Sequence, residues 1–291
     1  MSSAFNRSMR RGFHLILPLF TCAWILCLLT LTPSPAWPLT LELPAAAYQG
    51  DMIVGRVRPE APVFVGEQRQ AVGRDGVFVI GIERMQPADI TVSARDGKTE
   101  SRKIVRILAR QWDIQRIDGL ARRYVHPDPE QVKRIEADNR RIEAVRTKPP
   151  SPDPWFLDRG FILPVRGRVS SVYGSQRILN GEPKSPHRGI DIAAPEGTPV
   201  KSPAAGVARL VAPGLFLMGN ALIIDHGLGV QSTFIHLQRI LVKEGDRVVQ
   251  GQTVARVGKT GRASGPHLHW GVSAGTVLVD PQRVVGRRFG E

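Results

Sequence analysis

Cysteine is almost absent from this chain of 291 residues. Its only two cysteines, Cys22 and Cys27, lie in an N-terminal segment that we expect to be cleaved, as argued below. The mature chain would then contain no thiol, which excludes disulfide bonds, cysteine ligands to a metal and thiol catalysis. It must therefore be stabilised by its hydrophobic cores.

Acidic residues are also scarce, because the chain has 26 of them against 40 lysines and arginines. Without Arg7, Arg10 and Arg11 of the N-terminal segment, 37 basic residues remain and the formal charge is +11. Such a surface favours polyanions. The sequence contains no recognisable nucleic-acid-binding motif, so we expect no nucleic-acid partner and instead anionic polymers of the cell envelope.

Long hydrophobic runs are lacking except between His14 and Thr32. This run follows the three arginines and precedes the small residues Ser34-Pro-Ala36, a pattern typical of a cleaved signal peptide over residues 1–36. The mature protein is then expected in the periplasm or cell envelope. The alternative is an uncleaved anchor in the inner membrane, since the run approaches the ~20 residues that span a bilayer.

Residues 40–107 carry short β-branched runs, separated by turn signals such as Arg74-Asp-Gly76 and Arg95-Asp-Gly97. This pattern predicts a small antiparallel β-sandwich of immunoglobulin-like type. The runs are Met52–Val57, Ala61–Val65, Gly76–Ile80, Ile90–Ala94 and Lys103–Ile107.

Residues 108–154 are interpreted as a short helical connector followed by a proline-rich linker. Asp128 is placed to cap a helix that begins at Pro129. Apolar residues recur at helical spacing on this charged segment and predict a thin stripe that docks on a neighbouring domain. The stripe consists of Val132, Ile135, Ile142 and Val145.

Residues 155–291 lack any helix-length periodic stretch and are punctuated by proline and glycine, which predicts a second β domain. The whole chain is thus expected to be all-β apart from the connector. The predicted strands of this domain are Gly167–Val172, Pro199–Ser202, Gly206–Val211, Ala221–Ile224, Val230–Ile235, Thr253–Val257 and His267–Val272.

Five of the seven histidines fall in this second β domain, and such clustering favours a metal or acid–base site. His267 and His269 are two residues apart in a predicted strand and therefore share one face. His226, in Asp225-His-Gly227, is most simply a turn residue. The other two histidines are His187 and His236.

His187 and Asp191 are four residues apart in a segment whose prolines and glycine argue against a helix. On a straight strand they would be ~13 Å apart, so a bend at Arg188-Gly189 would have to bring them together. A hydrolytic zinc site takes three protein ligands and leaves a position for water. His187, Asp191 and one histidine of the pair His267 and His269 would supply these three ligands. The remaining histidine of the pair and His236 could transfer protons or stabilise an oxyanion.

A set of short motifs spans nearly all of residues 161–283. In sequence order the motifs are Ser170–Gly174, His187–Pro195, Gly197–Val200, Ala204–Val207, Gly219-Asn220, Ile224–Gly227, Phe234–Leu237, Val242–Val248, Gly258–Gly261, Gly265–His269 and Val279–Pro281. In these motifs the chain resembles the lysostaphin and LytM family of zinc peptidoglycan endopeptidases. The longer segment Gln176–Lys184, before the first candidate ligand, departs from the family pattern and is expected near the cleft.

The resemblance implies a LytM-type antiparallel β domain that binds Zn²⁺ through His187, Asp191 and His269. His236 and His267 would be the catalytic residues beside the zinc-bound water and the scissile carbonyl, with their two roles left unassigned. The implied reaction is hydrolysis of peptide cross-links in peptidoglycan by attack of that water. In a Gram-negative wall the implied bond joins D-alanine to meso-diaminopimelate.

Other functions remain to be weighed against this one. Some relatives have lost zinc ligands and activate cell-wall amidases without cleaving anything, but here all five candidate residues are present. The basic surface and the sandwich could bind anionic wall polymer alongside catalysis, and the N-terminal region could cover the cleft. A hydrolase of the wall would also need control, so a regulatory envelope protein is a further candidate partner.

Overall fold

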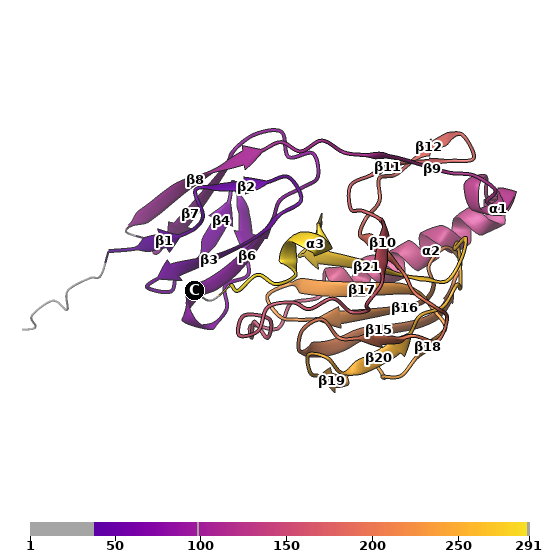
Figure 1. Ribbon diagram of the computed structural model, residues 1–291. Coiled ribbons are helices and arrows are strands. Elements are labelled where there is room, and N and C mark those ends of the chain that lie inside the picture. Colours follow the sequence, from indigo (N-terminus) through magenta and orange to yellow (C-terminus); the bar gives the residue numbers. More distant parts are fainter. Residues whose placement is uncertain (1–37, 98, 290–291) are drawn as a thin grey trace, which may run out of the picture. The chain divides into compact units, whose positions relative to one another are not determined.

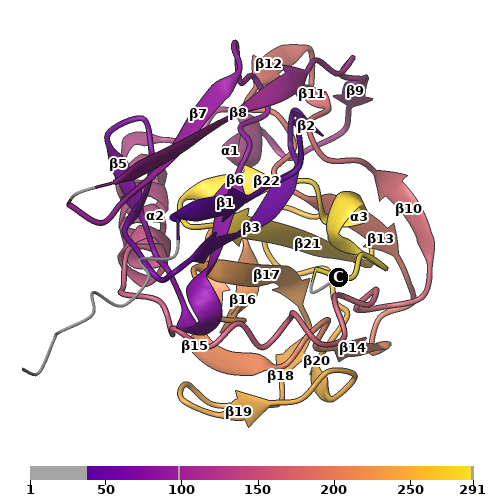
Figure 2. The same cartoon turned by 90° about the vertical axis from the view of Figure 1, so that its left-hand side faces the viewer.

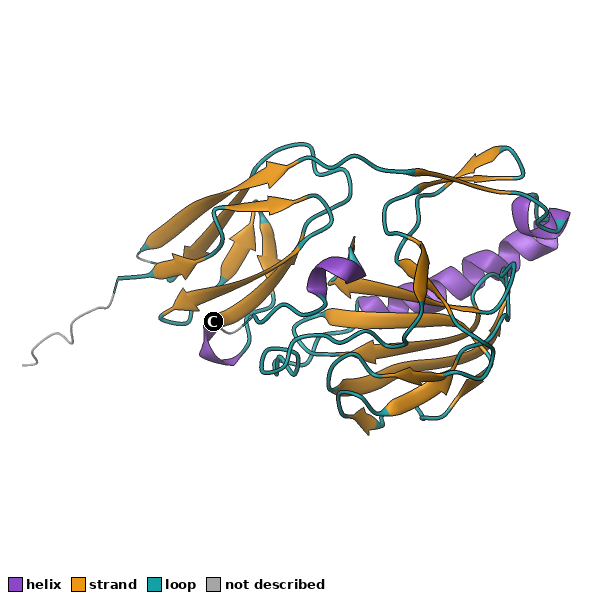
Figure 3. Ribbon diagram, in the orientation of Figure 1, coloured by secondary structure: helices purple, strands orange, loops and turns teal. Residues whose placement is uncertain are grey.

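The computed structural model describes residues 38–97 and 99–289, which belong to one compact unit. The predicted signal peptide, residues 1–36, lies outside the described residues. Within the described ranges, no helix is both long enough and apolar enough to cross a membrane. Strands dominate this part of the chain (Figure 3).

The N-terminal part forms two β-sheets packed face to face (Figure 1), with strand orders β1-β3-β6 and β2-β8-β7-β4-β5. Val57, Phe78, Val92 and Val105 are fully buried between them. The predicted immunoglobulin-like sandwich is confirmed, except that β2 pairs in parallel with β8 and that the sequence did not indicate the shortest strands. The elements are β1 (Thr40–Glu42), β2 (Ala46–Tyr48), β3 (Met52–Arg58), β4 (Val63–Val65), β5 (Gln68–Gln70), the 3₁₀ turn η1 (Arg74–Gly76), β6 (Val77–Gly81), β7 (Ile90–Arg95) and β8 (Glu100–Leu108).

Two helices follow the extended strand β9 (Ile114–Ile117), namely α1 (Arg122–Val125) and α2 (Pro129–Arg146). Helix α2 begins where the sequence predicts, because the Asp128 carboxylate accepts a hydrogen bond from the Gln131 amide at 2.8 Å. The Gln131 side chain in turn accepts from the Asp128 amide, which completes a capping box.

The apolar stripe of α2 docks only through its C-terminal half. Ile142 and Val145 are buried against residues of the large sheet described next, whereas Val132 is exposed. The helix therefore packs along this sheet (Figure 2). The residues of its last turns line one side of the cavity described below.

The C-terminal part is built on an antiparallel sheet with the order β10-β13-β21-β17-β16-β15-β19, and β22 pairs with β21. The hydrophobic core of this part contains the fully buried residues Leu222, Phe234 and Trp270. The predicted antiparallel β domain is confirmed. The strands are β10 (Arg168–Ser171), β13 (Ile190–Ala193), β15 (Gly206–Leu215), β16 (Gly219–Asp225), β17 (Val230–Leu237), β19 (Arg247–Val248), β21 (His267–Ala274) and β22 (Val277–Val279).

Two small sheets and a short helix complete the described chain. One sheet joins β14 (Pro199–Lys201), β20 (Thr253–Arg256) and β18 (Arg239–Ile240). In the other, β11 (Gln176–Leu179) pairs with β12 (Glu182–Lys184) and, in parallel, with β9. The segment Gln176–Lys184 is thus a hairpin held by the connector, and α3 (Pro281–Val284) follows β22.

His226 is a core residue, and its interpretation as a turn residue was incomplete. The side chain is fully buried, with Nδ1 donating to the carbonyl of Ala205 at 2.8 Å. Nε2 lies 2.9 Å from the Ser232 hydroxyl, which accepts from the Trp270 indole N–H. Burial lowers the pKa of His226 to about 4, so the ring is neutral and structural.

Candidate metal centre

His187, Asp191 and His269 converge on one point in the C-terminal part of the chain. Asp191 on β13 lies directly opposite His269 on β21, because the two strands pair in that register. The carboxylate Oδ1 of Asp191 is 3.1 Å from His187 Nε2 and 2.7 Å from His269 Nδ1, and the two nitrogens are 2.9 Å apart. Three buried donor atoms so close together form a candidate metal site.

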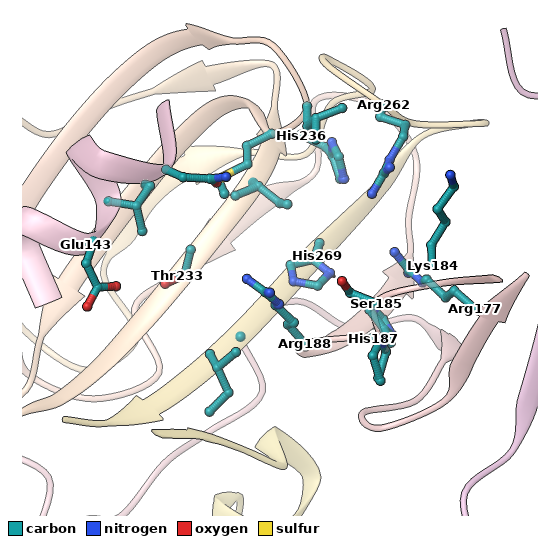
Figure 4. Close-up of a pocket in the computed structure, with 18 of the residues that line it drawn as sticks. Glu143, Arg177, Lys184, Ser185, His187, Arg188, Thr233, His236, Arg262 and His269 are labelled. Carbon is teal, nitrogen blue, oxygen red and sulfur yellow. The ribbon is translucent and has the colours of Figure 1, made fainter. Parts of the chain in front are cut away.

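The bend required between His187 and Asp191 occurs where the sequence predicts it. A side chain at Gly189 would overlap the backbone carbonyl oxygen of Trp270, so only glycine allows the chain to approach β21 this closely. The bend therefore brings the side chain of His187 back over the start of β13. Figure 4 shows His187 and His269 on neighbouring sides of the same space.

Contacts of the other ring nitrogen, Nδ1, fix the orientation of the His187 ring. Its Nδ1 lies 3.0 Å from the carbonyl oxygen of Val172, which can only accept, so Nδ1 carries the proton. The hydroxyl of Ser171 lies 2.8 Å from the same nitrogen and donates its own proton to Gln115. In the neutral tautomer with this Nδ1 proton, His187 would present the lone pair of Nε2 on the side of Asp191, as a metal ligand requires.

The protonation states also fit a metal site. Burial alone would raise the pKa of Asp191, but the contacts with His187 and His269 hold that pKa well below its usual range. Burial lowers the pKa of His269 to about 4, against the raising effect of Asp191. A charged carboxylate with neutral imidazoles is the form in which these side chains bind a divalent cation.

His236 and His267, the two predicted catalytic residues, lie beside the three candidate ligands. Their ring centroids are 4.8 Å apart, and His236 is 6.3 Å from the ring of His269. His267 Nε2 is 3.9 Å from Asp191 Oδ1. All five residues singled out from the sequence are thus brought together in one site.

Both additional imidazoles are held by backbone carbonyls. His236 Nδ1 donates to Thr260 at 2.8 Å, and His267 Nδ1 donates to Gly265 at 2.9 Å. His236 also adopts a left-handed backbone conformation with φ of 63°, which is strained for a residue with a side chain. Burial lowers its pKa to about 3, and the neighbouring histidines add to this effect, so the ring is neutral.

Arg177 is a residue of the site that sequence reasoning missed. It comes from β11 in the hairpin 176–184, and its Nη2 lies 2.8 Å from Oδ2 of Asp191. The guanidinium therefore holds the carboxylate oxygen that faces away from the histidines. The sequence marked the hairpin as an insertion near the cleft, but nothing local distinguished Arg177 from the chain's many other arginines.

A cavity of ≈ 650 Å³ opens beside the candidate ligands. Its apolar lining includes Ile142 of α2, Ile235 of β17 and Met218 of the turn between β15 and β16. Basic side chains also line it, from α2, from the hairpin 176–184 and from the loop before β21, together with polar residues and the acidic Glu143. The site is thus a cationic, partly apolar cavity with the His-Asp-His cluster in its wall.

Comparisons with known proteins agree with this geometry. The profile described as "Peptidase family M23" matches residues 185–281, a range that contains all five site residues. A crystal structure from Pseudomonas aeruginosa described as a peptidase M23 superimposes with a TM-score of 0.63 at 30% identity, covering 82% of this chain and 95% of that one.

Curated relatives match a part of the chain. The "Peptidoglycan DD-endopeptidase ShyC" of Vibrio cholerae is 40% identical over 119 residues, which is 40% of this chain and 27% of the relative. The "DD-carboxypeptidase/endopeptidase Mpg" of Neisseria meningitidis is 41% identical over 121 residues, which is 41% and 27% respectively. The chain thus spans about a quarter of the length of these relatives. The P. aeruginosa likeness, however, extends over most of both chains, and on this evidence the chain belongs to peptidase family M23.

Proposed function

We propose that this chain is an exported zinc metalloendopeptidase that hydrolyses peptide cross-links of peptidoglycan between D-alanine and meso-diaminopimelate. The observation that carries the proposal is the convergence of His187, Asp191 and His269, with His236 and His267 beside them. The names of relatives, which include peptidoglycan DD-endopeptidases, support this substrate class.

The donor set supports zinc as the metal. Two imidazole nitrogens and one carboxylate oxygen are ligands that Zn²⁺ accepts, and three protein ligands leave a coordination position open, as in catalytic zinc sites. When bound, zinc would supply Lewis-acid chemistry, lowering the pKa of a coordinated water and polarising the scissile carbonyl. Arg177 would keep Asp191 oriented through Oδ2.

His236 and His267 are assigned the proton transfers. Because each ring donates Nδ1–H to a backbone carbonyl, the neutral ring can only accept a proton at Nε2. One of them takes a proton from the attacking water, and the resulting Nε2–H can then be donated to the leaving amine. A protonated Nε2 can also hydrogen-bond the carbonyl oxygen as negative charge develops on it.

The metal dependence is tested with a matched pair of histidine variants. His187→Ala removes a candidate ligand, so we expect loss of bound zinc and of muropeptide cleavage. His126→Ala alters an exposed histidine outside the site and is expected to keep both. Zinc content by elemental analysis and cleavage with and without chelator are the measurements. Cleavage that survives chelation and His187→Ala would refute the metal mechanism.

The export part of the proposal rests on the pattern of residues 1–36, which lie outside the described structure. N-terminal sequencing of protein recovered from the envelope is expected to begin near Trp37. A first residue within 1–36 would instead favour the membrane-anchored alternative. The basic surface of the mature chain is proposed to help hold it on anionic envelope polymers.

A further inference from the structure

Two arginines in the cavity wall form no ion pair with any of the described residues. Arg146 is the last residue of α2, and Arg188 directly follows the candidate ligand His187. Both line the cavity together with His187 and His269. Among residues 38–97 and 99–289, none forms an ion pair with either guanidinium.

Arg146 is also incompletely hydrogen-bonded. Its Nε is buried and has no partner within the described residues. Burial lowers the pKa of Arg146, the neighbouring Arg188 lowers it further, and Glu143 opposes them. Keeping two like charges together with a buried unsatisfied donor is costly, and such a cost is relieved when an anion binds.

Two of the other basic groups of the cavity are already engaged in different contacts. Arg177 pairs with Asp191, and Arg262 donates to the carbonyl oxygen of Tyr124 at 3.3 Å. Figure 4 shows the Arg188 side chain on the opposite side of His269 from Arg177 and Lys184. An anion bound by Arg146 and Arg188 would therefore lie along the cavity, beside the reacting groups and separate from the Asp191 ion pair.

We propose that Arg146 and Arg188 form a carboxylate-binding site for the substrate peptide, next to the scissile bond. This inference rests on the proposed function. In a cross-link to meso-diaminopimelate, the carbon attached to the scissile nitrogen also bears a free carboxylate. Guanidinium groups bind a carboxylate through paired hydrogen bonds, and the apolar residues Ile142, Met218 and Ile235 suit the short alanine side chain nearby.

The test compares two cross-linked muropeptides that differ only at this carboxylate, which is free in one and amidated in the other. With zinc-loaded full-length mature protein, kcat/KM is expected to be about 10- to 100-fold higher for the free acid, because an ionic hydrogen-bonded contact is lost on amidation. Arg188→Gln and Arg146→Gln should bring this ratio to within about twofold of unity, mainly through KM for the free acid.

A matched control and a binding measurement accompany the kinetics. Arg239→Gln changes an exposed arginine on β18 that does not line the cavity, and the wild-type ratio is expected. Calorimetry with the acceptor-side product, free or amidated, gives the same comparison without turnover. Zinc content and melting temperature establish that each variant is loaded and folded.

The outcomes separate the two proposals. If wild-type protein cleaves both muropeptides in a chelator-sensitive way but with equal kcat/KM, the carboxylate site is refuted while the endopeptidase function stands. Equal loss of activity on both substrates in the Arg188 and Arg146 variants also refutes it. If wild-type protein cleaves neither muropeptide, the proposed function itself fails.

Discussion

At the scale of single residues, the site is organised by which nitrogen of each histidine is tied to the backbone. His187, His236 and His267 each direct Nδ1 to a carbonyl oxygen, so their Nε2 atoms face the centre. His269 instead presents Nδ1 to Asp191. The sequence predicted these histidines because each of them lies in a short motif of neighbouring residues. They could not indicate Arg146 or Arg177, whose burial depends on segments distant in the chain.

His226 gives a prediction for stability against pH. Its pKa is about 4 in the folded protein and near 6.5 when unfolded, so below pH 6.5 the unfolded chain binds more protons. The free energy of unfolding should therefore fall as pH decreases from about 6.5 to 4, by up to about 3 kcal/mol from this residue. Denaturant unfolding at several pH values measures this slope.

The control for this effect is His226→Gln, which removes the titrating group. This variant will be less stable overall, because it disturbs the contacts with Ala205 and Ser232. Its stability should nevertheless decline less steeply with falling pH than that of the wild type. Parallel slopes for the two proteins would show that His226 does not titrate as described.

At the scale of elements, strand register assembles the site. The pairing of β13 with β21 sets Asp191 opposite His269, and the left-handed turn at His236 near the end of β17 directs that ring beside them. Period-two patterns and turn residues sufficed to predict β17 and β21, whereas β13, which carries Asp191, was not predicted as a strand. The hairpin β11–β12 was predicted only as an insertion, because its parallel pairing with β9 joins residues about 60 positions apart.

Gly189→Ala tests the close approach of the chain to β21. The new Cβ would overlap the Trp270 carbonyl, so the segment must move away from β21. We expect the free energy of unfolding to fall by about 1–3 kcal/mol and zinc affinity to weaken, because the opposition of Asp191 and His269 is disturbed. Chemical denaturation and a competitive chelator titration measure the two effects.

The matched control is Gly265→Ala. Gly265 has open space where its Cβ would lie, and only its backbone carbonyl contacts His267. Stability and zinc affinity near the wild-type values are therefore expected. If the Gly189 and Gly265 variants behave alike, the bend is not what brings His187 and Asp191 together.

At the scale of the whole molecule, polar contacts join the sandwich and the start of the connector to the C-terminal part. Asp51 pairs with Arg283, Arg110 pairs with Asp280 at 2.9 Å, and Arg84 donates to the carbonyl of Gly174 at 2.7 Å. The sequence predicted both β parts from local patterns. It could not predict these contacts, since their partners are separated by 90 residues or more and carry no local signal.

The mature chain is proposed to cut one bond in the wall, and mass analysis of digested sacculi tests this cleavage most directly. Purified sacculi treated with zinc-loaded protein should lose cross-linked dimers and gain monomers that end in D-alanine and carry a free diaminopimelate amine. Chelator or His187→Ala should prevent this change. Persistent dimers, or products cut in the glycan or at the sugar–peptide linkage, would contradict the account.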